Sequence, residues 1–392
     1  MWSRRTRWVA LLALLTLAAP AVAFAESPPV ISPHRALGLS GFAENSLAAF
    51  EAAAKTGETD IEGDVFVTKD LAFVLSHDSP LRAPRCSGPY LDRSLRTLTA
   101  AQVAAMTCGG QPVARLDAVL AAVRPYPAAT VRIEVKNEVA DTSAQRTADA
   151  VRLARLFAST GWTARSIIQD FDWASTTGPM RTASPTQRVS ALSGGITVAQ
   201  VASARSSGVT DFSYAQAGAT GFWNQLIAAR GLTSTVWTVD QPLRARVLRA
   251  EGVGTIITDV PDTLRATLDD PGSQCTLAQY VRRTVTRGTG LAAGASQYRT
   301  LPALTPDGRV VEKELLRVRA STTAGTATLR ISPKGTPAGS QWEQVVAVGP
   351  LGTTVTLEVA GGDGGGVRIL NASTRAVRLE VATVGGTAWS CP

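Results

Sequence analysis

Between residues 31 and 268, short runs rich in β-branched residues alternate with alanine-rich segments whose apolar positions recur at helical spacing. Several of the alanine-rich segments end in glycine, as helices commonly do. The runs that we expect to form strands are VISPH, TDIEGDV, TVRIEVK, RSIIQDF, RVSAL, TDFSY, STVWTV and TIITDV. Strands that alternate with helices over this length predict an α/β fold, a (β/α)8 TIM barrel.

One segment interrupts the alternation. Only the residues TKDL separate the strand GDVFV from AFVLSHD, whereas a parallel crossover needs a dozen or more residues. We therefore expect an antiparallel hairpin attached to the second strand. A turn centred on KD would place Glu62 opposite His77 and Asp64 opposite Leu75. Glu62, Asp64 and His77 would then project from the same face of the sheet.

After residue 274 the helical spacing ends. Residues 275–392 show alternating apolar and polar positions divided by glycine-rich turns such as GGDGGG. This pattern predicts a small all-β, sandwich-like accessory domain. We place the barrel domain at residues 26–270 and the β-domain at residues 275–392.

The first 25 residues differ from the rest of the chain. MWSRRTRW carries arginines, VALLALLTLAAP is apolar, and AVAFA has the small residues that a signal peptidase reads. This order predicts a secretory signal peptide over residues 1–25 and a secreted, extracellular protein. The apolar run is too short to span a membrane, and no other long apolar run follows, so we expect no transmembrane segment.

The composition is that of a globular protein, with 45% hydrophobic and 18% charged residues. The net charge is +8, and cleavage of the signal peptide would remove three of the arginines. The remaining basic residues are scattered, without the runs that bind nucleic acid, so we expect no nucleic-acid partner. A basic exported protein suits anionic surroundings, such as a cell wall or lipid headgroups.

Export also determines how the cysteines are interpreted. The chain has four, and in an oxidising compartment an even number predicts two disulfides, with three possible pairings. We favour Cys86–Cys108 and Cys275–Cys391, because each bond would then close within one predicted domain. No CxxC spacing is present, so a zinc site is not expected.

Functional side chains in a TIM barrel lie at the C-terminal ends of the strands. The residues that the pattern places there are His34, Arg35, Glu62, Asp64, His77, Glu134, Lys136 and Trp237. Three carboxylates, Glu62, Asp64 and Glu134, would converge without a basic partner for each, which requires a neutralising cation. Hard oxygen ligands suit Mg²⁺ or Ca²⁺.

The other predicted site residues supply positive charge and proton transfer. Arg35 and Lys136 beside a metal could hold a phosphate group. His34 and His77, whose pKa values normally lie near neutrality, could act as general acid and general base. A metal, a phosphate clamp and two imidazoles together predict cleavage of a phosphodiester.

The segments HRALGLSGFAENSLAAF, IEGDVFVTKDLAFVLSHD, VRIEVK, VWTVD and GVGTIITDVPD resemble the glycerophosphodiester phosphodiesterase family over residues 34–262. The HR, ExD, HD and ExK elements occur in the family's order. The resemblance implies a TIM barrel with a small insertion and a divalent-metal hydrolase that yields glycerol 3-phosphate and an alcohol. The roles that it implies are acid–base catalysis by His34 and His77, metal binding by Glu62, Asp64 and Glu134, phosphate contacts from Arg35 and Lys136, and packing of Trp237 against the alcohol.

The chain departs from the family pattern at a few positions. Ala36 and Leu71 stand where the family usually has glycine, which affects the backbone more than the chemistry. Asp170 replaces a serine, and we expect this additional acid near the mouth of the barrel to change the choice of metal or the substrate contacts.

Three further residues lie beside the predicted site. We interpret Asn45 as the N-cap of the helix SLAAFEAAA. Asp78 follows His77, and we expect it to orient that histidine. Asp259 we interpret as the structural end of the last barrel strand.

Two alternative functions remain open at this stage. A phospholipase D of the sphingomyelinase D type resembles this pattern in its barrel, histidine pair and metal-binding acids. A non-catalytic cell-wall-binding protein would use the β-domain as its active module. For the favoured function, deacylated phospholipids and glycerophosphate polymers of the wall fit equally well as substrates, and either direct hydrolysis or a cyclic intermediate is compatible with the sequence.

Overall fold

The computed structural model describes residues 28–37, 41–270, 275–280, 284–300, 310–323, 325–333, 344–348, 350, 353–360 and 366–390. The predicted signal peptide over residues 1–25 lies outside these ranges. Within them, every helix is too short or too polar to cross a bilayer.

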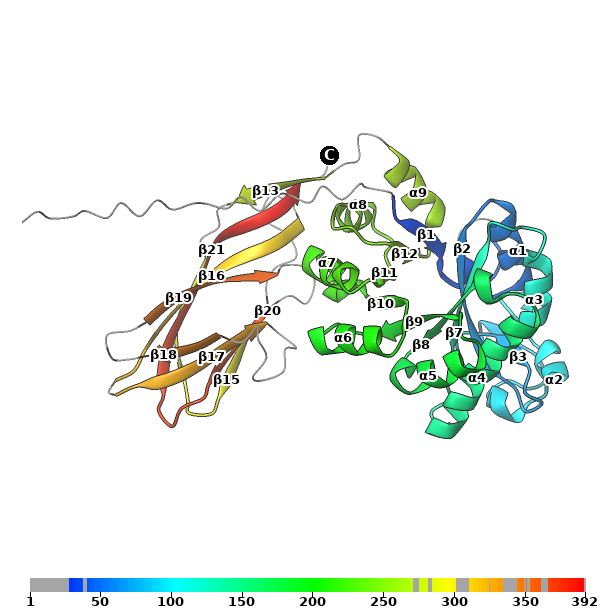
Figure 1. The fold of residues 1–392 in the computed structure, drawn as a ribbon, viewed down its shortest axis with the longest axis horizontal. Helices are drawn as coiled ribbons and strands as arrows, with labels where there is room; N and C mark the ends of the chain where they lie inside the picture. Colours follow the sequence, from blue (N-terminus) through cyan, green and yellow to red (C-terminus); the bar gives the residue numbers. More distant parts are fainter. Residues whose placement is uncertain are drawn as a thin grey trace, which may run out of the picture.

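Eight strands, all paired in parallel, form the barrel (Figure 1). They are β1 (Val30–Pro33), β2 (Asp60–Val67), β7 (Thr130–Val135), β8 (Ser166–Asp170), β9 (Arg188–Ser193), β10 (Asp211–Ala215), β11 (Thr233–Trp237) and β12 (Thr255–Thr258). Hydrogen bonds join them in the order β1-β12-β11-β10-β9-β8-β7-β2. Ser32 Oγ of β1 donates to Asp60 Oδ1 of β2 at 3.2 Å, so these two strands meet as well. The predicted (β/α)8 TIM barrel is therefore confirmed.

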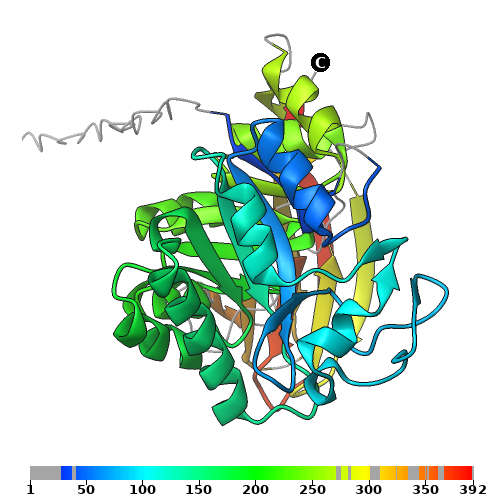
Figure 2. The same ribbon diagram turned by 90° about the vertical axis from the view of Figure 1, so that its right-hand side faces the viewer.

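Helices cover the outside of the strands (Figure 2). They are α1 (Leu47–Lys55), α3 (Leu116–Val123), α4 (Ser143–Ser159), α5 (Trp173–Ala183), α6 (Val198–Ser206), α7 (Gly221–Ala229), α8 (Pro242–Ala250) and α9 (Pro261–Asp269). Side-chain caps fix several helix starts: Thr142 and Gln145 form a capping box at α4. Apolar side chains of the helices and strands share one core, to which Phe50 of α1 and Ile61 of β2 belong, and both are fully buried.

A small insertion follows β2 and returns the chain to α3. Its elements are β3 (Phe73–Leu75), β4 (Cys86–Ser87), η2 (Leu95–Thr97), α2 (Ala100–Ala104), β5 (Thr107–Cys108) and β6 (Gln111–Pro112). It has its own apolar core, in which Leu81, Leu95 and Met106 are buried. The predicted disulfide between Cys86 and Cys108 is present and joins β4 to β5.

Strands β2 and β3 form the predicted antiparallel hairpin, but its register differs from our expectation by one residue. Val65, rather than Asp64, lies opposite Leu75. The predicted pairing of Glu62 with His77 is therefore wrong. β3 ends at Leu75, so His77 is not a strand residue at all.

The turn explains the shift in register. It contains three residues rather than two, because Thr68 N donates to Ala72 O at 2.9 Å across the turn. Leu71 closes the turn in the left-handed conformation, with φ of 64°. The chain then bends after β3, and this bend, rather than strand pairing, brings His77 to the mouth of the barrel.

After α9 the chain forms only β-strands in the described residues. They are β13 (Thr276–Tyr280), β14 (Thr284–Leu291), β15 (Ser296–Thr300), β16 (Val310–Ser321), β17 (Ala327–Pro333), β18 (Gln344–Val348), β19 (Thr353–Ala360), β20 (Gly366–Asn371) and β21 (Val377–Ser390). One sheet has the order β13-β21-β16-β19 with β14 on β21, and the other has the order β15-β20-β17-β18. Leu316 and Leu379 of the first sheet share a buried core with Leu329 and Ile369 of the second. The all-β character is as predicted.

The structure does not test two further predictions about this region. The domain limits at residues 26–270 and 275–392 stay a prediction. Cys275 is disulfide-bonded. Cys391, which we predicted as its partner, lies outside the described residues.

Candidate active site

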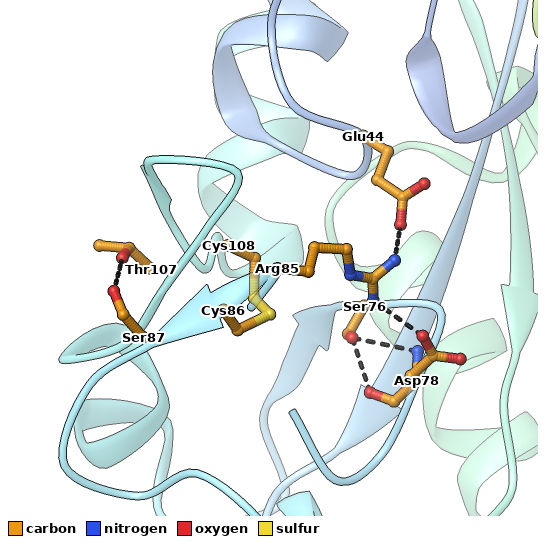
Figure 3. The surroundings of a disulfide bond; sticks show 8 residues. All are labelled: Glu44, Ser76, Asp78, Arg85, Cys86, Ser87, Thr107 and Cys108. Carbon is orange, nitrogen blue, oxygen red and sulfur yellow. Dashed lines mark hydrogen bonds and ion pairs between the residues drawn. A yellow bond between two sulfur atoms is a disulfide. The ribbon is translucent and has the colours of Figure 1, made fainter. Parts of the chain in front are cut away.

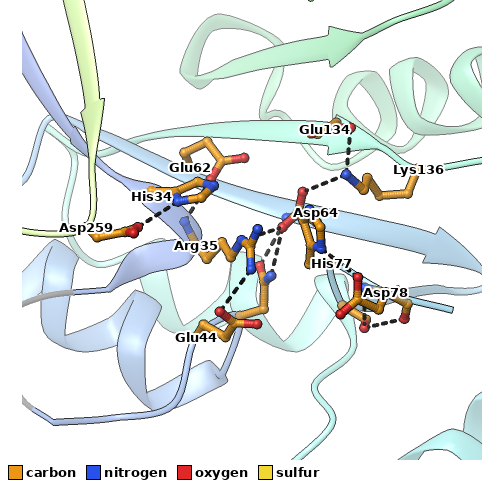
Figure 4. A network of polar contacts seen from close by, with 12 residues as sticks. His34, Arg35, Glu44, Glu62, Asp64, His77, Asp78, Glu134, Lys136 and Asp259 are labelled. Carbon is orange, nitrogen blue, oxygen red and sulfur yellow. Dashed lines mark hydrogen bonds and ion pairs between the residues drawn. The ribbon is translucent and has the colours of Figure 1, made fainter. Parts of the chain in front are cut away.

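The mouth of the barrel brings most of the predicted site residues together (Figure 4). They come from η1 (His34–Ala36), which directly follows β1, from β2, from the bend after β3 and from the end of β7. The residues that Figure 4 shows there are His34, Arg35, Glu62, Asp64, His77, Glu134 and Lys136.

Three buried carboxylates form the centre of the site. Glu62 and Asp64 alternate along β2, and the parallel register places Asp64 beside Glu134 of β7. One oxygen from each carboxylate lies within 4.8 Å of the others, so the three could hold a metal ion. Their exposed fractions are only 2%, 1% and 9%. The structure thus brings together the carboxylates that the sequence grouped as metal ligands.

Burial makes full ionisation of this cluster unfavourable. Loss of solvent, reinforced by the negative charge of Asp64, raises the pKa of Glu62 to about 7. The same two causes raise the pKa of Glu134 to about 8. Near neutral pH the metal-free cluster therefore retains protons that a bound cation would displace.

The side chain of Asn45 makes two hydrogen bonds to Asp64. The prediction that Asn45 is a helix cap is wrong. Its side-chain amide donates to Asp64 Oδ2 at 2.9 Å, and its Oδ1 accepts from Asp64 N at 3.0 Å. Ser46 is the N-cap of α1 instead, accepting from Ala49 N. Gly63 permits this close approach, because a Cβ there would lie 2.9 Å from Asn45 Oδ1.

Two basic side chains flank the carboxylates. Lys136 Nζ lies 2.9 Å from Glu134 Oε1 and 3.6 Å from Asp64 Oδ1. Arg35 Nε lies 3.7 Å from Asp64 Oδ2, and Arg35 N donates to Glu62 Oε2 at 2.7 Å. The backbone of Arg35 is left-handed, with φ of 55°. Positive charge therefore lies directly beside the carboxylate cluster.

His34 is paired with Asp259, which the sequence pattern did not include in the site. Its Nδ1 lies 2.7 Å from Asp259 Oδ1. Burial alone would lower the pKa of His34, but the Asp259 hydrogen bond and the charge of Glu62 raise it above its usual value. Asp259 does follow the last strand, as predicted, but it also orients a site histidine. The position of Asp259 could have indicated this contact. Strand β12 pairs with β1 and places Thr258 opposite Pro33, so the residues that follow them, Asp259 and His34, are neighbours.

His77 has a similar partner but an opposite pKa shift. Its Nδ1 lies 2.7 Å from Asp78 Oδ1, which is the contact predicted for Asp78. Burial and the positive charge of Lys136 lower the pKa of His77, and the hydrogen bond to Asp78 does not compensate. Both histidines thus use Nδ1 to bind an aspartate, which leaves the Nε2 atom of each ring available.

The carboxylate of Asp170 binds residues at the start of α5. It accepts hydrogen bonds from Thr176 Oγ1 at 2.6 Å and from Asp172 N at 2.8 Å, at the start of α5. Burial raises the pKa of Asp170 to about 6. Because both of its oxygens have partners in the fold, the expectation that it changes metal choice or substrate contacts has no support in the structure.

Trp237 ends β11 and packs edge to face against Phe171, with ring centroids 6.3 Å apart. Phe171 follows β8 and is 51% exposed. The Nε1 atom of Trp237 is buried without a hydrogen-bond partner among the described residues. An aromatic pair thus lies at the C-terminal ends of two barrel strands.

Together, the fold and the mouth of the barrel define a (β/α)8 protein with a buried carboxylate cluster, two flanking cations and two aspartate-bound histidines. Comparison with known families agrees with this fold. The model of the glycerophosphoryl diester phosphodiesterase family matches residues 34–263, so the chain belongs to this family. The resemblance noted from the sequence motifs is confirmed, and the protein is a phosphoric diester hydrolase by class.

Individual relatives cover the barrel. YhdW of Bacillus subtilis (strain 168), whose name assigns it to the glycerophosphodiester phosphodiesterases, is 28% identical over 239 residues, which are 59% of this chain and 95% of the relative. A glycerophosphodiester phosphodiesterase from Parabacteroides distasonis ATCC 8503 is similar in structure, with a TM-score of 0.53, 21% identity, and coverage of 62% of this chain and 98% of that one.

A second solved structure is a phosphodiesterase from Oleispira antarctica in complex with the product sn-glycerol-3-phosphate. It has a TM-score of 0.54, 17% identity, and coverage of 62% of this chain and 98% of that one. At such identities the solved structures show a shared fold.

Proposed function

We propose that the protein is a secreted, metal-dependent hydrolase that cleaves glycerophosphodiesters to glycerol 3-phosphate and an alcohol, with His34 and His77 as the acid–base pair. The observation that carries the proposal is the cluster of Glu62, Asp64 and Glu134, with oxygens within 4.8 Å of one another. The product bound to the Oleispira antarctica phosphodiesterase supports the same substrate class.

The carboxylate cluster fits a divalent cation, and we propose Ca²⁺ or Mg²⁺. All three donors are hard oxygen ligands, which these ions prefer. Burial raises the pKa of Glu62 to about 7 and that of Glu134 to about 8, which supports a place for additional positive charge in the cluster. A bound ion would supply Lewis-acid polarisation of the phosphoryl group.

The substrate's phosphate would lie between Arg35 and Lys136. Both cations already approach the carboxylate cluster, within 3.7 Å and 2.9 Å respectively, so an anion can bind them without a large rearrangement. Arg35 can offer two parallel donors to phosphate oxygens, and Lys136 offers a compact positive charge. Trp237 would pack against the alcohol.

The two histidines would divide the proton transfers between them. The pKa of His34 is raised, which favours its protonated form as the donor to the leaving alcohol. The pKa of His77 is lowered, which favours its neutral form as the acceptor of a proton from the attacking group. Asp259 and Asp78 would hold the two rings in place through their Nδ1 atoms.

Secretion is supported by the signal peptide predicted at residues 1–25 and by the Cys86–Cys108 disulfide, a bond typical of exported proteins. Association of the β-domain with a cell wall or another anionic surface remains a proposal based on its place after an exported enzyme. Deletion of residues 275–392, followed by measurement of wall retention, tests it.

A substrate panel tests the proposed activity. The purified protein should release sn-glycerol 3-phosphate from glycerophosphocholine with Ca²⁺ or Mg²⁺, and a chelator should abolish the release. The Glu62→Gln variant should lose activity at equal metal concentration, whereas Glu51→Gln, an exposed carboxylate on α1, should not. Turnover of sphingomyelin alone would favour the sphingomyelinase D alternative, and absence of any hydrolysis would favour a non-catalytic binding protein.

A further inference from the structure

Arg85 in the insertion lies between two acidic residues that serve different parts of the site (Figure 3). Its Nη2 donates to Asp78 Oδ2 at 2.8 Å, and its Nη1 donates to Glu44 Oε1. The other oxygen of Asp78 binds His77 Nδ1 at 2.7 Å. The other oxygen of Glu44 accepts from Arg35 Nη1 at 3.0 Å. One guanidinium group therefore links the partner of a histidine to the partner of the phosphate-binding arginine.

The disulfide fixes the backbone from which this guanidinium extends. Cys86 directly follows Arg85 and is bonded to Cys108. Gly109 N donates to Arg85 O at 2.9 Å, so both strands of the disulfide-linked pair hold this residue. A Cβ on Gly109 would lie 2.6 Å from the Cβ of Ala43, which shows how closely the insertion approaches the loop before α1.

The ion pair of Arg85 with Asp78 affects the orientation of Asp78 more than the stability of the fold. The side chains of Arg85 and Asp78 are 40% and 54% exposed, and ion pairs at such positions contribute little to fold stability. Asp78 has no second ion pair with an arginine or lysine in the described part of the chain. Its carboxylate would therefore turn more freely without Arg85, and the ring of His77 with it.

We propose that Arg85 is a positioning residue that acts through Asp78 to hold the ring of His77 in the orientation that catalysis requires. The inference rests on the proposed function, because it assumes that His77 transfers a proton during hydrolysis. The insertion thus contributes a side chain to the organisation of the site, and the disulfide determines where that side chain begins.

The test compares Arg85→Gln with Arg85→Lys and with Arg82→Gln, using hydrolysis of glycerophosphocholine. Arg82 is a matched control, because its guanidinium pairs with exposed Asp92 at 3.5 Å in the same insertion. We expect Arg85→Gln to lower kcat about tenfold with KM within about twofold of the wild type, because orientation of a proton-transfer group affects the chemical step. Arg85→Lys should recover most of kcat, since an ammonium group can still bind Asp78.

A double-variant experiment tests whether Arg85 affects kcat through Asp78. In an Asp78→Asn background, Arg85→Gln should cause no further loss of kcat, because the two residues act in one chain of contacts. Equal melting temperatures for wild type and Arg85→Gln, measured by calorimetry, would show that the loss is not one of folding.

Several results would overturn the proposal. They are an unchanged kcat in Arg85→Gln, a raised KM with kcat retained, failure of lysine to restore kcat, or losses that multiply in the double variant. A wild type and an Arg82→Gln variant that are both inactive would instead refute the proposed function, so the two failures are distinguishable.

Discussion

Metal binding by the carboxylate cluster should be strongly dependent on pH. Burial and the charge of Asp64 raise the pKa of Glu62 to about 7 and that of Glu134 to about 8 in the metal-free chain. A divalent cation binds the ionised carboxylates, so it must displace these protons. Each displaced proton weakens the apparent affinity tenfold per pH unit below its pKa, so the affinity should fall roughly 50-fold between pH 7 and pH 6.

Isothermal titration calorimetry with Ca²⁺ from pH 5.5 to 9 measures this affinity directly. Repeating the titration in two buffers of different ionisation enthalpy gives the number of protons released. We expect more than one proton released at pH 6 and fewer at pH 9. Glu134→Gln should weaken binding and remove one proton from the count, whereas Glu51→Gln, on the exposed face of α1, should change neither.

Stability without metal gives a second readout with a defined sign. The folded-state pKa values of Glu62 and Glu134 lie above those of unfolded glutamates, so their protonated forms favour the folded state. This stability is complete below about pH 4, the unfolded pKa range, and is lost as the pH rises through about 7 to 8. The metal-free melting temperature should therefore fall over this interval, and saturating Ca²⁺ should remove the fall. Affinity that is constant from pH 6 to 8, or release of no protons, would refute the reasoning.

Three further predictions concern single residues. The pH profile of kcat/KM should be bell-shaped, with an acid limb from His77 and an alkaline limb from His34. Asp259→Asn should move the alkaline limb to lower pH, because Asp259 raises the pKa of His34. An alkaline limb that does not move in this variant would contradict the assignment. Leu71→Gly should raise the free energy of unfolding by about 0.5 to 1 kcal/mol in urea titrations, because Leu71 is left-handed and 50% exposed, whereas Lys69→Gly in the same turn should lower it. Gly63→Ala should weaken Ca²⁺ binding, because the new Cβ would lie 2.5 Å from Phe50 Cζ and 2.9 Å from Asn45 Oδ1. It would displace Asn45, whose side chain makes two hydrogen bonds to Asp64. Wild-type affinity in the variant would show that these hydrogen bonds are not needed for metal binding.

The sequence was sufficient to predict the barrel and most of its site. Runs of β-branched residues between alanine-rich segments at helical spacing located the eight strands. Strand ends in a parallel barrel converge, so Glu62, Asp64 and Glu134 could be grouped from the sequence. The pattern did not indicate α5, whose sequence WASTTGPMRTA contains Gly178 and Pro179 and has a weak apolar stripe. That helix depends on its buried contacts and on the hydrogen bonds of Asp170 to Asp172 and Thr176 rather than on its own propensity.

The remaining errors all involve backbone conformations or long-range partners that spacing does not reveal. The hairpin register depended on Leu71 adopting a left-handed conformation that leucine rarely takes. Asn45 is also left-handed, with φ of 54°, which directs its side chain to Asp64 instead of to the helix start. Asp259 meets His34 across 225 residues, and only the pairing of the last strand with the first brings them together.

The central claim is that a metal-binding carboxylate cluster and two histidines hydrolyse a glycerophosphodiester. The most direct test is the rate of sn-glycerol 3-phosphate release from glycerophosphocholine by wild type, His34→Ala and His77→Ala at saturating Ca²⁺, with Ca²⁺ affinity measured on the same samples. We predict that each histidine variant binds Ca²⁺ like the wild type but loses about 10²- to 10⁴-fold in kcat. Histidine variants with wild-type kcat, or a wild type without activity on the substrate, would contradict the account.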